Sequence, residues 1–371
     1  MILIAYGTRP EIIKFFPLIK EFEINKIKFE TLFTGQHPDL YKNMKCLIPK
    51  PDYILNDIME CNQTLNRLSS KILYQIDDIF DLIIRKYSKL DYIIVQGDTT
   101  TSYIIAVSAY YRSIKIMHLE AGLRTNNKLS PFPEEGNRQL ISRIADIHFC
   151  PTKLAVKNLK NENITENVYN VGNTIVDAFK YIVSNHSSIL NNEIVDNKLL
   201  NSIKSKKYIL ITLHRRENRG EKMINMWKQI NELSLERNDI VYIYLKHPSL
   251  KNVSSYLTND KIILLEPCNY ITMVILINNS CGIITDSGGI QEEAVSANKK
   301  VLVCRDTTER PETIESGYGL LIDDKIKDNI RFLLENSKSD NTDSNTIDKI
   351  DNPYGENVCQ KIIEIIKNLY L

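Results

Sequence analysis

Several features are absent from this 371-residue sequence, and each absence excludes a class of protein. The apolar runs are only strand length, and the start Met1–Tyr6 lacks the basic segment and long apolar core of a signal peptide. We therefore expect a cytoplasmic protein without membrane segments. The net charge is +1 and the charged residues are interspersed, so we expect neither nucleic acid nor a membrane surface as a partner.

Two motifs that hold metals or cofactors are also absent. The seven cysteines include no Cys-x-x-Cys pair, which argues against a disulfide framework and against a structural zinc site. No Gly-x-Gly-x-x-Gly sequence occurs, which argues against tightly bound NAD or FAD. We therefore expect a protein with reduced thiols that works without a metal and without a cofactor.

Short β-branched segments alternate with amphipathic segments along the chain, which predicts an α/β fold with parallel sheets. Strands are expected in a first series at 2–6, 29–34, 92–96, 114–119 and 147–150, and in a second series at 208–213, 240–245, 262–265, 282–285 and 301–304. The clearest helix is 64–86, whose apolar residues recur mostly at spacings of three and four.

Two such series in a chain of this length predict two doubly wound, Rossmann-like domains. We place them at 1–168 and 169–356, with a C-terminal helix at 357–371 that joins the first domain. The polar stretch from about Ser184 to Lys207 is expected to be a surface insertion, and Ser337 to Asn352 a mobile loop.

The first strand leads into Gly7-Thr8-Arg9-Pro10-Glu11, a strand-to-helix turn of the kind that binds phosphate. Thr8 and Glu11 have the spacing of a capping box, and Pro10 suits the first turn of a helix. Capping explains these three residues but not Arg9 or Lys14. We therefore expect an anion near this turn.

Acidic and basic residues concentrate where the third and fourth strands of the first series end. Asp98 follows one strand and is either a helix N-cap or a chemical group, or both. Glu120 follows the next strand, and the segment to Arg138 adds Arg124, Glu134 and Glu135. Exposed ion pairs would also explain such charges, but their density between prolines and a glycine favours an active-site cleft.

The second series of strands has corresponding groups at its strand ends. His214 comes first, with Arg215 and Arg216 beside it, and these guanidinium groups favour the neutral imidazole. His247 follows the next strand in the same way, but an ordinary surface loop explains this position better than a functional role does. Ser287-Gly288-Gly289 then opens a helix as an anion cradle, with Glu293 one turn later to meet a ribose. A Gly-rich connection alone is the alternative.

Together these motifs resemble the non-hydrolysing UDP-N-acetylglucosamine 2-epimerases, in order and over nearly the whole chain. The segments that carry the resemblance are 7–11, 97–100, 118–124, 133–135, 214–215, 286–293 and 305–312. The resemblance implies a GT-B-like fold, with two Rossmann-like domains facing across a cleft. It also implies reversible conversion of UDP-N-acetylglucosamine to UDP-N-acetylmannosamine, by loss and return of UDP through 2-acetamidoglucal.

Site residues follow from the resemblance position by position. Those matching acid and base groups are Asp98, Glu120, Glu134 and His214. Those matching the nucleotide-sugar site are Arg9, Lys14, Arg138, Cys268, Met273, Ser287, Gly288, Gly289, Glu293 and Arg310, although Cys268 and Met273 lie in a loop that departs from the Gln and Phe common in relatives. Those matching a site for UDP-N-acetylglucosamine as an activator are Gln36, Gln63, Arg215 and His247, while Asn62 stands where some relatives carry Arg.

The resemblance also implies a homodimer, and a product used for surface polysaccharides such as capsules.

Other functions remain open on the sequence. A GT-B glycosyltransferase would share the fold but need an acceptor pocket, of which the first domain shows no sign. A nucleotide-sugar sensor would not need Asp98, Glu120, Glu134 and His214 together. A hydrolysing 2-epimerase is disfavoured by the Glu120-Ala-Gly-Leu-Arg124 pattern, and a modified UDP-sugar substrate is disfavoured by the Gly7–Glu11 sequence.

Overall fold

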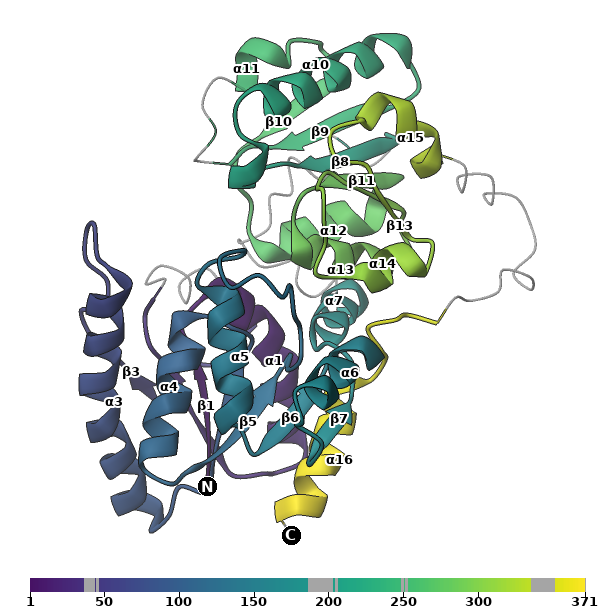
Figure 1. Cartoon of the computed structure of the whole chain (residues 1–371). Coiled ribbons are helices and arrows are strands. Elements are labelled where there is room, and N and C mark those ends of the chain that lie inside the picture. The colour runs from purple at the N-terminus through teal and green to yellow at the C-terminus, as the bar shows by residue number, and fades with distance from the viewer. Residues whose placement is uncertain are drawn as a thin grey trace. The chain divides into compact units, whose positions relative to one another are not determined.

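The computed structural model of the chain describes residues 1–36, 44, 47–185, 203, 206–247, 250, 253–334 and 351–370. The chain divides into two compact units, Met1–Ala178 with Tyr354–Leu371, and Phe179–Pro353 (Figure 1). The insertion expected from about Ser184 to Lys207 and the loop expected from Ser337 to Asn352 lie largely outside the described residues.

The first unit contains a parallel seven-stranded sheet in the order β3-β2-β1-β4-β5-β6-β7. Its strands are β1 (Ile2–Tyr6), β2 (Phe29–Phe33), β3 (Tyr53–Ile54), β4 (Tyr92–Gln96), β5 (Lys115–Leu119), β6 (Ile147–Cys150) and β7 (Val168–Asn170). The five expected strands are confirmed to within a residue. The expected domain boundary at 168/169 falls inside β7, which pairs with β6 and so belongs to this sheet.

Helices cover both faces of this sheet, which explains why its strands read as continuous apolar runs. The helices are α1 (Arg9–Ile24), α3 (Leu65–Tyr87), α4 (Thr100–Tyr111), α5 (Glu134–Ile144), α6 (Lys153–Asn161), α7 (Ile175–Ser184) and α16 (Val358–Tyr370). Residues of α3, α4 and α5 share one apolar core with alternate residues of β1 and β4. On the other face, α16 returns from the end of the chain to pack against α1.

The second unit repeats this plan with a parallel six-stranded sheet in the order β10-β9-β8-β11-β12-β13. The strands are β8 (Tyr208–Thr212), β9 (Val241–Leu245), β10 (Ile262–Leu265), β11 (Gly282–Thr285), β12 (Val301–Val303) and β13 (Gly319–Leu321). The helices are η1 (Arg216–Asn218, 3-10), α10 (Glu221–Glu236), α11 (Val253–Tyr256), α12 (Tyr270–Asn279), α13 (Gly288–Ser296), α14 (Pro311–Glu315) and α15 (Ile326–Leu334). Two doubly wound, Rossmann-like domains are therefore confirmed.

The strand orders identify where each unit should bind a ligand. The order in which successive strands are added to the sheet reverses between β1 and β4 in the first unit and between β8 and β11 in the second. Ligands of open α/β sheets bind at the carboxyl ends of the strands beside such a reversal. The turns after these four strands contain Arg9, Asp98, His214 and Ser287, so the sequence motifs lie where the fold predicts a site.

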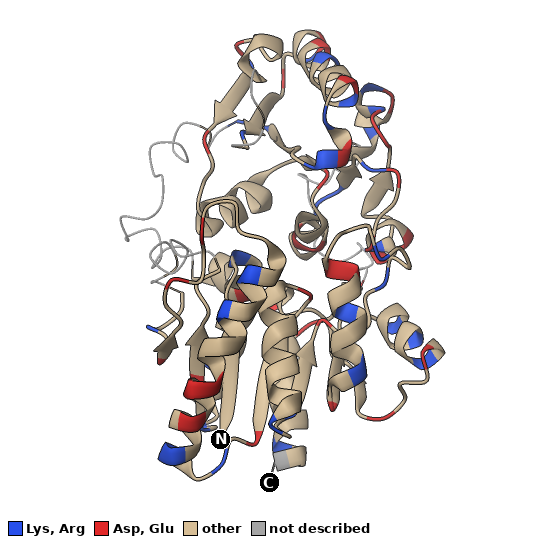
Figure 2. Cartoon of the chain, turned by 60° about the vertical axis from the view of Figure 1, so that its left-hand side comes forward, with Lys and Arg blue, Asp and Glu red and all other residues tan. Residues whose placement is uncertain are grey.

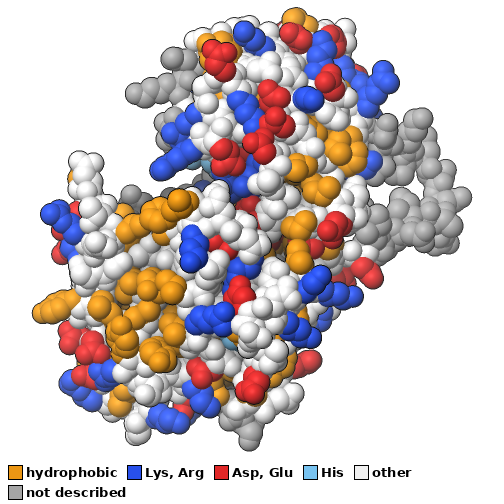
Figure 3. Space-filling model, viewed as in Figure 1, with side chains coloured by type: hydrophobic (Ala, Val, Ile, Leu, Met, Phe, Trp, Pro, Cys, Tyr) orange, Lys and Arg blue, Asp and Glu red, His pale blue; other side chains and the backbone are white. Residues whose placement is uncertain are grey.

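The surface is mixed in character. Basic and acidic residues are interspersed along the helices of both units (Figure 2). Apolar side chains gather on the part of the first unit that α3 and α4 cover (Figure 3). Exposed apolar residues of α3, α4 and α5 include Leu73, Leu82, Tyr110, Tyr111 and Leu140. Among the described residues, none of the helices combines the length and apolar character needed to span a bilayer.

Candidate active site

Glu120 occupies a special backbone position at the end of β5. Its φ angle is 60°, in the left-handed region that non-glycine residues seldom adopt, and Gly122 follows with φ 86°. Such a conformation costs of the order of 1 kcal/mol and persists only where surrounding contacts enforce it. The strand therefore ends in a sharp turn that keeps the Glu120 carboxylate at the edge of the sheet.

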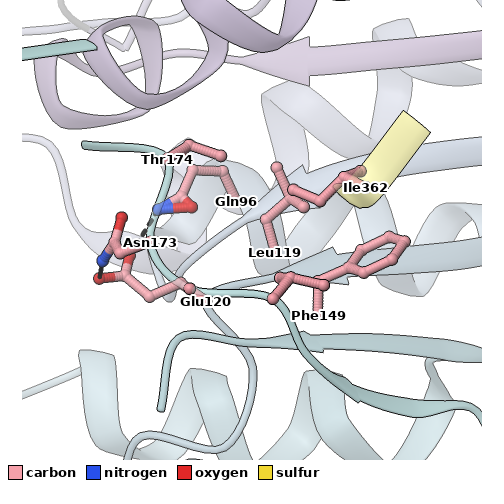
Figure 4. Close-up of a pocket in the computed structure, with 9 residues that line it drawn as sticks. Gln96, Leu119, Glu120, Phe149, Asn173, Thr174 and Ile362 are labelled. Carbon is pink, nitrogen blue, oxygen red and sulfur yellow. Dashed lines mark hydrogen bonds between the residues drawn. The ribbon is translucent and has the colours of Figure 1, made fainter. Parts of the chain in front are cut away.

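Three side chains from three different elements donate hydrogen bonds to the Glu120 carboxylate. Lys14 Nζ and Gln96 Nε2 both lie 2.5 Å from Oε2, and Asn173 Nδ2 lies 3.1 Å from Oε1. Figure 4 shows the Gln96 and Asn173 amides directed at the carboxylate, beside a pocket with room for about one water molecule. The side chains of Lys14 and Glu120 are each less than a tenth exposed, so this ion pair is shielded from solvent.

Asp98 is held by the helix that follows Pro133. Its side chain forms an ion pair with Arg138, and its backbone carbonyl accepts a hydrogen bond from Asn137 Nδ2 at 2.8 Å. The N-cap of α4 is Thr99 rather than Asp98, because the Thr99 hydroxyl accepts the hydrogen bond from the Ser102 N–H. Capping therefore does not explain Asp98, whose side chain is a quarter exposed.

The remaining charges of the 120–138 segment divide into two groups. The Glu162 carboxylate accepts hydrogen bonds from Arg124 Nε and Nη2, at 2.6 and 2.9 Å. Glu135 is fully buried and accepts hydrogen bonds from the N–H groups of Thr125 and Asn126. Arg124 and Glu135 shape the loop. Glu134 differs, since its Oε2 is shielded from solvent and has no hydrogen-bond partner among the described residues.

The turn after β1 is organised by Glu11 as the capping-box pattern predicts. Glu11 Oε2 accepts hydrogen bonds from the N–H groups of Gly7 and Thr8, at 3.0 and 2.7 Å. Its Oε1 accepts from the Thr99 and Ser102 hydroxyls, and burial raises its pKa. The Gly7 and Thr8 N–H groups are thus already bound within the protein, so an anion here would rely on the cations Arg9 and Lys14.

His214 lies directly after β8 and is fixed by Asp286, which follows β11. The fully buried Asp286 carboxylate accepts hydrogen bonds from the backbone N–H groups of His214 and Arg215, and from Asn218 Nδ2 at 3.0 Å. His214 Nδ1 lies 3.4 Å from Asp286 Oδ1. This contact favours a proton on Nδ1, which leaves Nε2 with a lone pair for proton transfer.

Burial is the main reason that the pKa of His214 is lowered. The Asp286 charge opposes this shift, whereas His247, Arg215 and Arg219 add to it. The His247 ring stacks on His214 with centroids 4.9 Å apart and an interplanar angle of 17°. The structure therefore favours neutral His214, as the sequence predicts, although burial contributes more than the guanidinium groups.

The anion cradle of the second unit contains a tightly packed arginine. A Cβ atom on Gly288 would lie 2.6 Å from Arg310 Nη1 and 2.7 Å from Glu309 Oε1, so a larger residue would displace one of them. Arg310 also lies 3.0 Å from Glu292 Oε1. Because Gly288 lacks a side chain, a guanidinium group can lie against the start of α13, where backbone N–H groups favour an anion.

Glu309 connects this arginine with two others. Its carboxylate lies 2.8 Å from Arg310 Nη1, 2.6 Å from Arg305 Nη1 and 3.6 Å from Arg215 Nη2. Burial raises the pKa of Glu309, but the three guanidinium groups outweigh it and hold the pKa at about 2. Glu309 is therefore ionised at neutral pH and keeps the arginines gathered beside Gly288.

The other expected site residues lie at the same strand ends but are less constrained. Ser287 precedes α13 as its N-cap, Gly289 has open space where a Cβ would be, and Glu293 is buried in α13. Cys268 and Met273 flank the start of α12, which is capped by Asn269. These positions are compatible with a nucleotide but do not identify one.

Two of the expected activator residues lie in each unit. In the first unit, Gln36 accepts a hydrogen bond from the Thr101 hydroxyl at 2.8 Å. The Gln63 amide contacts its own loop, donating to the Ile58 carbonyl and accepting from the Glu60 N–H. In the second unit, Arg215 lies beside Glu309 and His247 stacks on His214.

Sequence reasoning missed the residues that hold these groups in place. Gln96, Asn173, Asp286 and Glu309 contact Glu120, His214 or Arg310 from separate segments of the chain, and none carries a local spacing pattern of its own. Gln96 ends β4 and Asp286 directly follows β11, and this position at a strand end was the one available signal. Asn173 and Glu309 lie three residues after β7 and six residues after β12, and had no such signal. The described residues also contain no group of three or more His, Cys, Asp or Glu arranged to hold a metal ion.

Comparisons with known proteins agree with this geometry. A family model described as UDP-N-acetylglucosamine 2-epimerase matches residues 20–367. Proteins named UDP-N-acetylglucosamine 2-epimerase from Salmonella borreze and Campylobacter jejuni are each 40% identical to the chain, covering 98% of it and 96% and 97% of their own lengths.

Solved structures extend the likeness to the fold. The UDP-GlcNAc 2-epimerase of Neisseria meningitidis, bound to UDP-GlcNAc, matches with a TM-score of 0.84 at 34% identity over 99% of both chains. The MnaA–UDP co-structure from S. aureus matches with a TM-score of 0.82 at 35% identity, over 99% of this chain and 96% of that one. The expected GT-B-like fold class is thereby confirmed, and the chain belongs to the UDP-N-acetylglucosamine 2-epimerase family.

Proposed function

We propose that the protein interconverts UDP-N-acetylglucosamine and UDP-N-acetylmannosamine without hydrolysing them. The observation that carries this proposal is the Glu120 carboxylate, which three donors hold at a strained strand end beside the cation Lys14. Proton transfer and departure of a diphosphate need these two types of group side by side. Family membership supplies the substrate class.

The proposed reaction inverts carbon C2 by elimination and addition. The C2 proton is not next to a carbonyl, so its direct removal would be very slow. When the C1–O bond to UDP breaks, its electron pair leaves with the diphosphate and C1 gains positive character that acidifies C2. A base then takes the C2 proton, C1 and C2 become doubly bonded in 2-acetamidoglucal, and UDP returns to C1 as a proton adds to the opposite face of C2.

Both units supply residues for proton transfer and for binding. We assign proton transfer to Asp98, Glu120 and Glu134 of the first unit and to neutral His214 of the second. Glu134 suits this role because its shielded Oε2 has no hydrogen-bond partner in the part of the chain that the structure describes. We assign nucleotide-sugar binding to Arg9, Lys14, Arg138, Ser287, Gly288, Gly289 and Arg310, with Glu293 at the ribose and Cys268 and Met273 beside the uracil.

The experiment follows the sugar by proton NMR in deuterated water after UDP-N-acetylglucosamine is added. Reversible epimerisation incorporates deuterium at C2 and leaves both nucleotide sugars at equilibrium. Free N-acetylmannosamine with stoichiometric UDP would instead identify a hydrolysing enzyme. The reverse reaction is measured from UDP-N-acetylmannosamine, with and without added UDP-N-acetylglucosamine. If no deuterium enters C2 under any of these conditions, the proposal is refuted.

Activation by UDP-N-acetylglucosamine is a finer part of the proposal. We assign the activator to Gln36, Gln63, Arg215 and His247. The stacking of His247 on His214 supports this, because a ligand at His247 would contact a neighbour of the proposed acid-base group. The initial rate of the reaction from UDP-N-acetylmannosamine should therefore rise when a trace of UDP-N-acetylglucosamine is added. A progress curve that is linear from the start without added UDP-N-acetylglucosamine would contradict activation.

We further propose a cytoplasmic homodimer whose product supplies N-acetylmannosamine for surface polysaccharides such as capsules. Exposed apolar residues on the neighbouring helices α3, α4 and α5 support self-association of the first unit. Light scattering should give about twice the chain mass of 42.9 kDa, and a monomer at all concentrations would contradict the dimer. Loss of N-acetylmannosamine from surface glycans in a deletion strain would test the pathway.

A further inference from the structure

Asn173 lies three residues after the end of β7 and is buried beside Glu120. Two contacts fix the orientation of its amide. Its Oδ1 accepts a hydrogen bond from the Ile175 N–H at 3.1 Å, so the NH2 group must face the other way. That group donates to Glu120 Oε1 at 3.1 Å (Figure 4). Rotation of the amide would place two donors against one another, so Asn173 can present only a donor to Glu120.

The backbone of Asn173 is fixed by the returning end of the chain. Its N–H donates to the Tyr354 carbonyl at 2.8 Å. Gly172, with φ 102°, packs so closely that a Cβ there would lie 2.5 Å from the same carbonyl oxygen. The segment that leads into α16 therefore determines where the Asn173 side chain can reach, although it lies some 180 residues further along the chain.

The donors around Glu120 are divided between its two oxygens. Lys14 and Gln96 both contact Oε2, whereas Asn173 contacts Oε1. Donors on both oxygens determine the rotation of the carboxylate about its last bond, and donors to the charged form favour that form. Asn173 therefore helps to fix this rotation through its contact with Oε1.

We propose that Asn173 is a positioning residue that sets the orientation and favours the ionised state of the Glu120 carboxylate. This inference rests on the proposed function, because it assigns Asn173 to the same proton-transfer step. Asn173 should therefore influence kcat and its pH dependence while leaving UDP binding almost unchanged.

The test compares pH profiles of epimerisation for wild type, Asn173→Asp and Asn173→Ala. In Asn173→Asp the bond from the Ile175 N–H survives, but a second carboxylate replaces the donor and disfavours ionisation of Glu120. The acid limb of the kcat profile should move to higher pH by about one unit or more. Asn173→Ala should lower kcat by about 10-fold with KM changed by less than about 2-fold.

Asn25→Asp is the matched control. Asn25 Nδ2 donates to Glu21 Oε2 at 3.2 Å, so this variant also places a carboxylate beside a glutamate, but at the end of α1 outside the site. Its profile should match that of wild type. Thermal unfolding and UDP calorimetry on all variants show whether each is folded and binds nucleotide.

The outcomes separate this inference from the proposed function. If wild type fails to exchange deuterium at C2, the proposed function fails and the role of Asn173 fails with it. If wild type epimerises but both folded variants keep its kcat and acid limb, the positioning role alone is refuted. If Asn173→Asp does not fold, Asn173→Ala alone tests the positioning role. A lower kcat with an almost unchanged KM supports the role, and an unchanged kcat refutes it.

Discussion

Asp286 holds His214 by both its backbone and its ring. The carboxylate accepts the His214 N–H at about 3 Å and lies 3.4 Å from Nδ1 of the same residue. One buried carboxylate therefore sets both the position of the loop and the tautomer of the imidazole. Because Asp286 is itself fully buried, we infer that it presents Nε2 of His214 rather than contacting a ligand.

We expect Asp286→Asn to lower kcat by at least about 10-fold, because its amide cannot accept from every donor that the carboxylate binds and would no longer favour the Nδ1–H tautomer. UDP affinity should change much less. Deuterium exchange at C2 measures the first effect and calorimetry the second. Asp306→Asn, at a carboxylate that is 76% exposed, is the control, and an equal loss in both variants would argue against a specific role.

Glu120→Gln should abolish turnover while UDP still binds. The substitution keeps the size of the side chain but removes its charge and its capacity to take a proton. Lys14 and Gln96 would then face a neutral amide, so we also expect a modest loss of stability. Normal turnover in the deuterium-exchange experiment would remove Glu120 from the catalytic set.

The fully buried His118 should make stability depend on pH. Burial is the main cause that lowers its pKa to about 3, although its Nε2 bonds the Gly97 carbonyl. An unfolded histidine titrates near 6.5, so between about pH 6.5 and 3 the unfolded chain binds the extra proton. The stability contributed by neutral His118 is thus complete above pH 6.5 and is lost as the pH falls through that range.

The matched variant is His118→Gln, which can still donate to the Gly97 carbonyl but does not titrate. Urea unfolding at pH 7.5 and 5.5 should show wild type losing up to about 1.4 kcal/mol more per pH unit below 6.5 than the variant. His148, whose pKa burial lowers to about 4, remains in both proteins and supplies a common background. Equal losses would mean that His118 is not buried in its neutral form.

The sequence predicts the sheets well because their strands are buried on both faces and read as unbroken apolar runs. The strands it misses are β3, β7 and β13, each two or three residues long at or near a sheet edge. Such short segments carry no periodicity to detect. Leu65 and Leu73 of the helix expected at 64–86 are about 40% exposed, because the helix buries a narrower stripe than its sequence indicates.

The sequence predicts the candidate site only in part, because the partners of its residues come from distant segments of the chain. Glu120, Asp98, His214 and Ser287 could be found because each directly follows an apolar strand. Their partners could not, since Asn173 reaches Glu120 only when β7 pairs in the sheet and the chain end returns beside it. Whether a carboxylate is held, paired or buried depends on contacts that the local sequence does not encode.

Gly288 and Gly289 offer a direct test of the arginine cluster. In Gly288→Ala the new Cβ would meet Arg310 Nη1 at 2.6 Å and Glu309 Oε1 at 2.7 Å, so Arg310 must move. Arg310 forms ion pairs with Glu309 and Glu292, so moving it disturbs both contacts. We therefore expect the UDP affinity of Gly288→Ala to fall by about 10-fold or more. The same disturbance should cancel the stability that alanine would otherwise add to the helix.

Gly289→Ala is the matched substitution for stability, because its Cβ meets no atom within 4 Å. Alanine in the first turn of α13 should raise the free energy of unfolding by about 0.5–1 kcal/mol, since it restricts the unfolded chain more than glycine does. Urea unfolding of both variants without nucleotide should therefore show Gly288→Ala less stable than Gly289→Ala by about 1 kcal/mol. Equal stability and an unchanged UDP affinity for Gly288→Ala would show that Arg310 does not depend on the missing side chain at Gly288.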